Sequence, residues 1–396
     1  MKKNILIVVI ILAITGYIAG VLTTKKLAEE QLPRMITDFT DYHDIAVQVE
    51  WLEQGLRSGK LRISGENNVD DSMSVTFSEE IDLTYGFLSA RWRGQGFSQI
   101  TSILADEPLP PYTYTSSGKV SRGGVFVDYE ADVFSGTLDT MTFEIGAAEM
   151  QIALVGNKIV ADWQAAYATI GMPGVDSMSM RDVKVHWGTQ IRQGIVEVLD
   201  MRVAIGSMSF TDETEHWESD GINYTVFMDL TRDMATIYGT SAMDLPFLAV
   251  SNELALDWRL RGVVSSDVVK LQQHLANGTL YDLDFEDLQS LELQSEEPEL
   301  VLERFDGASD QFGTLKMSGS VVFLADHWSE ALTALDNDEP VQFDWAMQGL
   351  RIDITVAEIP PMMQMLLLTL PEDVQAMPLR FTLKDGLMEV NGFPLQ

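Results

Sequence analysis

Cysteine is absent from the sequence, and basic residues are scarce. Without cysteine there can be no disulfide, thiolate zinc site, catalytic thiol or lipidated N-terminal cysteine. Lys and Arg number 26 against 60 Asp and Glu, which gives a formal net charge of -34. A surface this negative repels phosphate backbones, so we expect no nucleic-acid partner.

Histidine and the common catalytic motifs are also rare. Three of the five histidines, His186, His216 and His327, each precede a tryptophan. Neighbouring residues of a strand point to opposite faces, so each pair predicts a buried Trp beside an exposed His. The chain has no H-E-x-x-H, G-x-S-x-G or P-loop motif, and residues 93–97 (R-G-Q-G-F) match only half of a dinucleotide fingerprint. We therefore expect no enzyme, no cofactor and no required metal.

Acidic residues gather at 212–218, 282–287 and 336–339, where none has the spacing of a calcium loop. We interpret these clusters as solvated faces.

The N-terminus contains the one long uncharged run. Residues 5–22 carry no charge and would span about 27 Å as a helix. They predict an uncleaved transmembrane anchor after a cytoplasmic tail of residues 1–4, and a cleaved signal peptide is the alternative. Within the run, Gly16 and Gly20 form a G-x-x-x-G pair, which either packs two spans together or is an ordinary pair of small residues. The apolar stretch 362–370 is too short to cross a bilayer.

The rest of the chain has the composition of a folded, strongly acidic protein. All 60 acidic residues but only 22 basic ones follow residue 26, so this part carries -38. Apolar residues make up 46% of the chain and charged residues 22%, which is typical of globular domains. The length allows two or three domains. We expect a soft division near residues 240–250, into β-rich regions 27–245 and 246–396.

Two-residue alternation of apolar and polar side chains recurs through the chain, as at residues 141–145, 224–230, 254–260 and 351–353. This pattern predicts a mainly β, α+β fold of large antiparallel sheets with three or four short helices. Turns are expected at 135–136, 155–157 and 384–386, a loop or exposed edge at 106–118, and a connection at 295–299. Helices are expected from Ser265 to just before Gly278, from Pro360–Pro361 through residue 370, and over 162–170.

Two C-terminal stretches resemble a known family. Residues 299–303 (E-L-V-L-E) with 313–321 (G-T-L-K-M-S-G-S-V), and the ending 383–395 (L-K-D-G-L-M-E-V-N-G-F-P-L), are similar to motifs of the YdgA-like family of bacterial envelope proteins. The resemblance covers both ends of the chain and its C-terminal third. It implies an inner-membrane anchor with residues 27–396 in the periplasm, and it supplies no catalytic residue.

The apolar content raises a binding hypothesis. Twenty methionines either fill the core or line an adaptable apolar surface. The expected function is non-enzymatic binding of a lipid or another apolar ligand in a β-sheet groove, with Met362, Met363, Met365, Leu366 and Leu367 as contacts. Two alternatives stay open: a homodimerising module that docks an envelope assembly partner, and a carboxylate-based hydrolase of envelope glycans.

Overall fold

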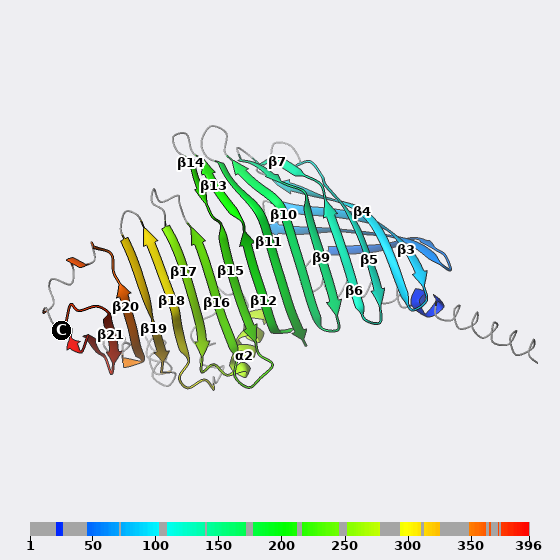
Figure 1. Ribbon diagram of the computed structural model, residues 1–396. Coiled ribbons are helices and arrows are strands. Elements are labelled where there is room, and N and C mark those ends of the chain that lie inside the picture. Colours follow the sequence, from blue (N-terminus) through cyan, green and yellow to red (C-terminus); the bar gives the residue numbers. More distant parts are fainter. Residues whose placement is uncertain are drawn as a thin grey trace, which may run out of the picture. The chain divides into compact units, whose positions relative to one another are not determined.

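The computed structural model describes residues 21–26, 46–70, 73–102, 109–138, 141–171, 177–211, 216–244, 252–277, 294–309, 313–324, 348–361, 364–365, 371 and 374–395. Strands and the helix α2 (Ser265–Asn277) are labelled along the chain in Figure 1, and the chain divides into two compact units. Unit 1 comprises Met1–Val185 and Ser209–His216, and unit 2 comprises His186–Met208 and Trp217–Gln396.

Unit 1 is an antiparallel sheet in which β1 to β6 pair in chain order, β6 then pairs with β9, and β9 pairs with β10. Its strands are β1 (Ala46–Gln54), β2 (Ser58–Asp70), β3 (Met73–Gly86), β4 (Ser89–Ser102), β5 (Tyr112–Ser121), β6 (Gly124–Ala131), β7 (Phe134–Leu138), β8 (Met141–Ile145), β9 (Ala148–Val155) and β10 (Lys158–Gly171).

Strands β6 to β9 form one long hairpin with two short interruptions. The pairing of β6 with β9 and that of β7 with β8 follow the same register, and β10 pairs with both β9 and β8. The breaks lie at residues 132–133 and 146–147, where backbone hydrogen bonds to neighbouring strands continue, as from Gly146 N to Tyr167 O at 2.9 Å.

Unit 2 is also an antiparallel sheet. Its ladder runs β12–β15–β16–β17–β18–β19–β20–β21–β22–β23, antiparallel throughout. The strands are β12 (Ile195–Ile205), β15 (Ile222–Asp229), β16 (Thr236–Asp244), β17 (Asn252–Arg261), β18 (Glu299–Ser309), β19 (Gly313–Phe323), β20 (Leu350–Glu358), β21 (Leu379–Lys384), β22 (Leu387–Val390) and β23 (Phe393–Pro394). Three further strands carry residues of both units: β11 (Ser177–Arg192), β13 (Ser207–Thr211) and β14 (His216–Ser219).

The mainly β, antiparallel prediction is confirmed. The alternating stretches 141–145, 224–230 and 254–260 lie in β8, β15 and β17, and the turns at 155–157 and 384–386 join β9 to β10 and β21 to β22. The described residues hold two helices, residues 21–26 and α2 (Ser265–Asn277), where three or four were expected. The second begins and ends where its predicted caps place it.

Three local predictions are wrong. Residues 162–170 form part of β10 instead of a helix, because they pair with β9 and β8 across the sheet. The expected loop at 106–118 contains β5, which is an interior strand between β4 and β6. Ser135 and Gly136 lie inside β7 and not in a turn.

The predicted membrane anchor over residues 5–22 lies almost entirely outside the described residues. Among the residues that are described, no helix is both long enough and apolar enough to span a membrane. The expected boundary near residues 240–250 falls between β16 and β17, which pair along their full lengths inside unit 2. The two compact units divide at Val185–His186, within β11, and again at Met208–Ser209 and His216–Trp217.

Glycines opposite aromatic residues recur in both units. A Cβ added to the glycine would overlap the ring of the directly opposite residue, so the ring lies over the glycine backbone. Such close cross-strand pairs favour one register, because a slipped strand would place a larger side chain under the ring. The pairs are Gly96–Tyr114, Gly118–Trp92, Gly136–Phe143 and Gly239–Trp258.

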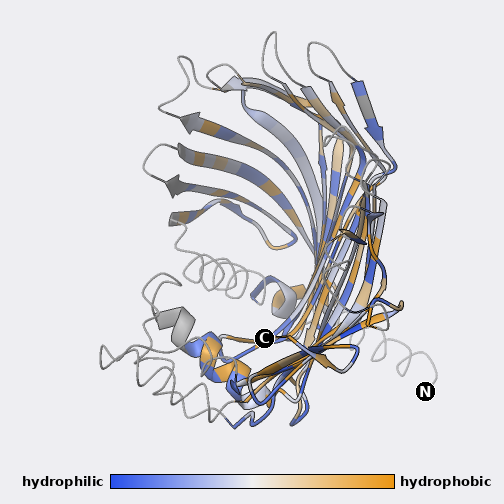
Figure 2. Ribbon diagram, turned by 90° about the vertical axis from the view of Figure 1, so that its left-hand side faces the viewer, coloured by the Kyte–Doolittle hydropathy of each residue, from blue (hydrophilic) through white to orange (hydrophobic). Residues whose placement is uncertain are grey.

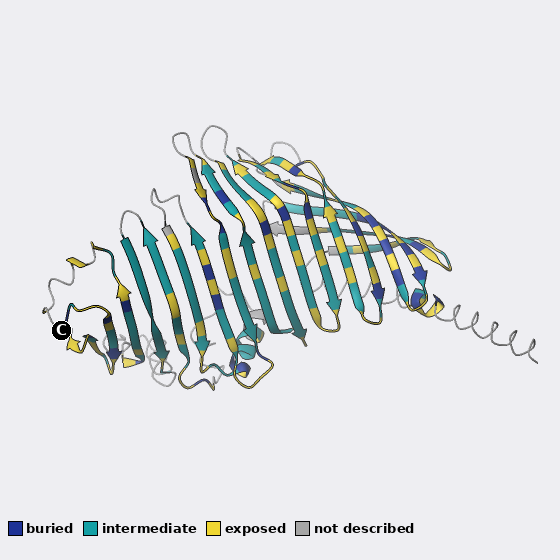
Figure 3. Cartoon of the chain, in the orientation of Figure 1, coloured by how far each residue is buried: buried dark blue, intermediate teal, exposed yellow. Residues whose placement is uncertain are grey.

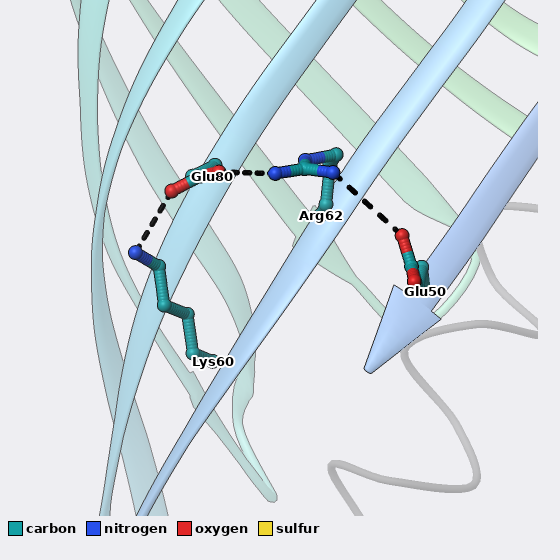
Figure 4. Close-up of polar contacts among 4 residues, drawn as sticks. All are labelled: Glu50, Lys60, Arg62 and Glu80. Atoms are coloured by element: carbon teal, nitrogen blue, oxygen red, sulfur yellow. Dashed lines mark hydrogen bonds and ion pairs between the residues drawn. The ribbon is translucent and has the colours of Figure 1, made fainter. Parts of the chain in front are cut away.

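The polar face of unit 1 carries a charge ladder across β1, β2 and β3 (Figure 4). Glu50, Arg62 and Glu80 are directly opposite one another in register. The Glu80 carboxylate is 2.6 Å from Arg62 Nη2 and 2.8 Å from Lys60 Nζ, and Arg62 Nη1 is 3.8 Å from Glu50. Hydrogen bonds from Lys60 and Arg62 lower the pKa of Glu80 to about 2, so this carboxyl stays ionised at any physiological pH.

Candidate functional site

Unit 2 presents one almost uninterrupted apolar face. Following the register from β12 to β22, each apolar residue lies opposite another apolar or small residue. Hydrophobic and hydrophilic residues alternate along strands in Figure 2. We call this surface the apolar face. Its larger members are Leu199, Met201, Val203, Ile205, Ile222, Tyr224, Val226, Met228, Ile237, Met243, Leu254, Leu256, Trp258, Leu260, Leu300, Leu302, Phe305, Leu315, Met317, Val321, Ile352, Ile354, Val356, Leu379, Phe381, Leu383, Met388 and Val390.

The opposite face of the same sheet is polar and ion-paired. Asp353 and Arg380 are directly opposite on β20 and β21 and form a bidentate ion pair, with distances of 2.8 and 2.5 Å. Lys316 binds Glu358 at 2.7 Å across β19 and β20. This face also holds the stacked pair Phe227 and Tyr238, but its ion pairs are absent from the apolar face as far as the structure describes it, so the two faces differ in chemistry, as expected of a sheet with one side in water.

The apolar face has a closed part and an open part (Figure 3). At the closed part, Val356, Leu379 and Val390 are buried and form a cluster with Val374, a residue from the connection between β20 and β21. Over β12 and β15 to β19, none of the described large apolar side chains of the face is fully buried. We call this second part the open stretch.

The open stretch has the dimensions of a ligand surface. Six strands make it about 24 Å wide, and four alternate residues on a strand make it about 20 Å long. Contiguous apolar patches of this size on a soluble protein typically mark a ligand or partner site. Trp258 forms part of its floor, with the indole ring lying over Gly239 of the neighbouring strand.

Helix α2 is fixed at one end of these strands. The Asp267 carboxylate accepts hydrogen bonds from the backbone N–H groups of Gln294 and Ser295 and from the Ser295 hydroxyl, at 2.5–2.9 Å. Further along the helix, the Gln272 amide bonds both backbone groups of Val196 on β12, at 3.0 and 3.1 Å. The first turn of α2 is thus tied to the segment that precedes β18, and the middle of the helix is tied to β12.

Of the predicted contact residues, only Met365 is among the described residues, and its side chain is 67% exposed. Beside it, Gln364 N donates to Pro360 O at 3.1 Å in a helical turn that begins at the predicted prolines. Met362, Met363, Leu366 and Leu367, and the predicted packing residues Gly16 and Gly20, lie outside the described residues.

Unit 1 contains a buried polar site that no sequence motif predicted. Glu79 of β3 lies on the apolar side of its strand, between Phe77 and Ile81, and is only 6% exposed. Ser116 donates to its Oε1 in a short hydrogen bond, and Tyr114 donates to its Oε2 at 3.4 Å. Both donors belong to β5, two strands away, so these bonds cross β4.

Glycines in β4 make this crossing possible. A Cβ at Gly94 would overlap both Glu79 Oε1 and Ser116 Oγ, and a Cβ at Gly96 would overlap the Tyr114 ring. The R-G-Q-G-F stretch therefore serves the sheet interior and opens no dinucleotide site. Strict alternation through β3 would have identified Glu79, because it is the one charged residue in an otherwise apolar register.

Burial sets the protonation of this site. It raises the pKa of the Glu79 carboxyl, and the hydrogen bonds from Ser116 and Tyr114 oppose that rise. Burial and the nearby Glu79 also raise the pKa of the Tyr114 and Tyr129 hydroxyls, so both remain protonated donors.

The other candidates bring no chemistry together. Within the described ranges, no three His, Asp or Glu side chains are placed to hold a metal ion. At the first His–Trp pair the prediction is wrong, since Trp187 is 52% exposed while the His186 side chain is 31% exposed. The acidic clusters at 282–287 and 336–339 lie outside the described residues.

Comparison with known proteins adds no family to this geometry: no family model, no curated protein and no solved structure matches the chain.

Proposed function

We propose that the protein is a non-enzymatic, inner-membrane-anchored periplasmic protein that binds the acyl chain of a lipid on the open stretch of unit 2. The carrying observation is the open stretch itself, an apolar surface six strands wide in a chain whose net charge is -34. The localisation rests on the uncharged run 5–22 and on the resemblance to the YdgA-like family.

The physical reason is the match between a flat apolar sheet and a flexible hydrocarbon. Each methylene removed from water contributes up to about 0.8 kcal/mol, so a chain lying along the strands gains affinity from length more than from any single contact. Aromatic and thioether side chains such as Trp258, Met201 and Met228 adapt to such a ligand. The polar face on the opposite side of the sheet keeps the sheet soluble.

The test is native mass spectrometry of the full chain purified in mild detergent, followed by lipid extraction. Phospholipid retained at a fixed stoichiometry is expected. A lipid-free dimer that does not respond to added lipid would contradict the proposal and favour the homodimerising module.

Matched variants locate the ligand. Val226→Asp places a charge on the open stretch, and Thr225→Asp places the same charge on the adjacent residue, which faces the opposite side. The amount of lipid retained should fall in the Val226→Asp variant and be unchanged in the Thr225→Asp variant. Identical circular dichroism spectra of the two variants serve as the control for folding. Equal loss from both would place the lipid elsewhere.

A further inference from the structure

One end of unit 1 gathers the tips of four hairpins. The register aligns the end of β1 with the start of β2, the end of β3 with the start of β4, and so on to the turn between β9 and β10. The turns at residues 55–57, 87–88, 122–123 and 156–157 therefore lie at the same end of the sheet. We call this end of unit 1 the basic end.

Large apolar side chains project from the basic end into solvent. Leu56 is 58% exposed, Phe87 52% and Leu88 41%, all in turns, and Phe126 and Val155 on the adjoining strands are 43% and 45% exposed. Aliphatic and aromatic side chains on loop tips are costly in water and are typical of proteins that touch the interface of a bilayer.

Basic residues accompany these tips. The second row of the polar face, counted from the turns, holds Arg91 and Lys119 directly opposite each other. Lys158 lies in the first row, and Arg122 lies in a turn. Acidic residues first appear one row further in, as Asp82 beside Arg93. Away from the basic end the sign reverses, and Glu130 lies opposite Glu149.

Two basic side chains of this end, those of Arg91 and Lys119, have no acidic partner in the part of the fold that the structure describes. Among the described residues, neither Arg91 nor Lys119 makes an ion pair, whereas Lys60 and Arg62 nearby are both paired. Like charges directly opposite on a sheet destabilise it. In a chain with 26 basic and 60 acidic residues, such a cluster is a local site at which a negatively charged partner can bind.

The basic end is also where the predicted anchor reaches the sheet. In the helix of residues 21–26, drawn in dark blue beside the strand ends of unit 1 (Figure 1), Val21 is 3% exposed and packs in one cluster with Leu61, Leu83 and Trp92. This helix continues the uncharged run 5–22. The hairpin tips therefore lie beside the point where that run ends.

We propose that the basic end docks on an anionic phospholipid surface, with Leu56, Phe87 and Leu88 inserted among the headgroups and Arg91, Lys119 and Arg122 bound to lipid phosphates. Basic residues near such a surface strengthen attachment about fivefold each, and salt weakens the effect. This inference concerns unit 1 and does not depend on a ligand in unit 2.

The absence of cysteine allows a direct test with the full chain. Leu88→Cys introduces one thiol at the basic end, where Leu88 is 41% exposed. Val133→Cys introduces one at another exposed apolar position, 55% exposed, which lies beyond β6 and about 30 Å from the turns along the strand direction. Each variant is labelled with an environment-sensitive dye and reconstituted in vesicles containing phosphatidylglycerol and chain-brominated phosphatidylcholine. Bromine should quench the dye at residue 88 and leave the dye at residue 133 unchanged.

Charge reversal separates docking from mere anchoring. Arg91→Glu, Lys119→Glu and Arg122→Glu together should abolish the quenching at residue 88, as should 0.5 M salt. Arg202→Glu, Arg304→Glu and Arg380→Glu, which change the net charge equally in unit 2, should not. If protein that floats with the vesicles shows the same solvent-exposed dye signal at residues 88 and 133, the proposal is wrong, whatever unit 2 binds.

Discussion

The substitution Gly94→Ala tests most sharply whether Glu79 and Ser116 are hydrogen-bonded across β4. The new Cβ of Gly94→Ala would occupy the space between Glu79 Oε1 and Ser116 Oγ, so the hydrogen bond between them must break or the strands must move apart. Losing a buried hydrogen bond to a charged group costs about 1.5–3 kcal/mol, and overpacking costs a further 1–3 kcal/mol or so. The lower backbone entropy of Ala returns about 0.5–1 kcal/mol.

The expected net loss is about 2–5 kcal/mol, which corresponds to a melting temperature lower by roughly 5–15 °C. Thermal unfolding followed by tryptophan fluorescence is the assay, since Trp92 is buried in the same sheet. Gly123→Ala is the matched control, because its Cβ would find no heavy atom closer than 3.6 Å. In a Ser116→Ala background, Gly94→Ala should cost less than it does alone, since half of the overlap is gone. If Gly94→Ala is as mild as Gly123→Ala, the close approach of these strands is refuted.

Three further changes have defined outcomes. Burial raises the folded pKa of Glu79 above its unfolded value, so the contribution of Glu79 to stability is complete at low pH and is lost as pH rises through the folded pKa. The free energy of unfolding of Glu79→Gln should therefore rise relative to that of the wild type between pH 4 and pH 8, by about 1.4 kcal/mol per unit of pKa difference. Urea denaturation at each pH measures this difference. A gap that does not change with pH would contradict this. Asp267→Ala leaves three donors without their acceptor and should speed hydrogen exchange of the Ser295 amide at least about tenfold, corresponding to a loss of about 1.4 kcal/mol or more, while unchanged exchange would show that other contacts hold α2. Arg380→Ala removes the pair with Asp353, but both side chains are largely exposed, so unfolding should shift by less than about 1 kcal/mol; a larger shift would mean that the pair supports the fold.

The strands were predictable where alternation is strict. Residues 254–260 place four apolar side chains on one face and two charges on the other, and they form β17. The helix expected over 162–170 does not form, because pairing with β9 overrides the helix preference of the alanines there. No pattern within one segment reveals which partner it will pair with.

The candidate site was predictable only in kind. The sequence indicates a one-sided apolar sheet, but the proposed contacts at 362–367 were chosen from local hydropathy. The open stretch depends on register: Val226 lies between Met201 and Gly239, residues that are far apart in the chain. The basic end was hidden for the same reason, since Arg91 and Lys119 are separated by 28 positions and meet only through the pairing of β4 and β5.

Photocrosslinking at two adjacent positions of β15 tests the lipid-binding face most directly. Tyr224 points to the open stretch, and Thr225 points to the polar face. A photoreactive benzoylphenylalanine is placed at either position in the full chain, which is then irradiated in membranes and analysed by mass spectrometry. We expect a phospholipid adduct from position 224 and none from position 225. Adducts of equal yield at both positions, or a protein crosslink in place of lipid at position 224, would contradict lipid binding on the apolar face.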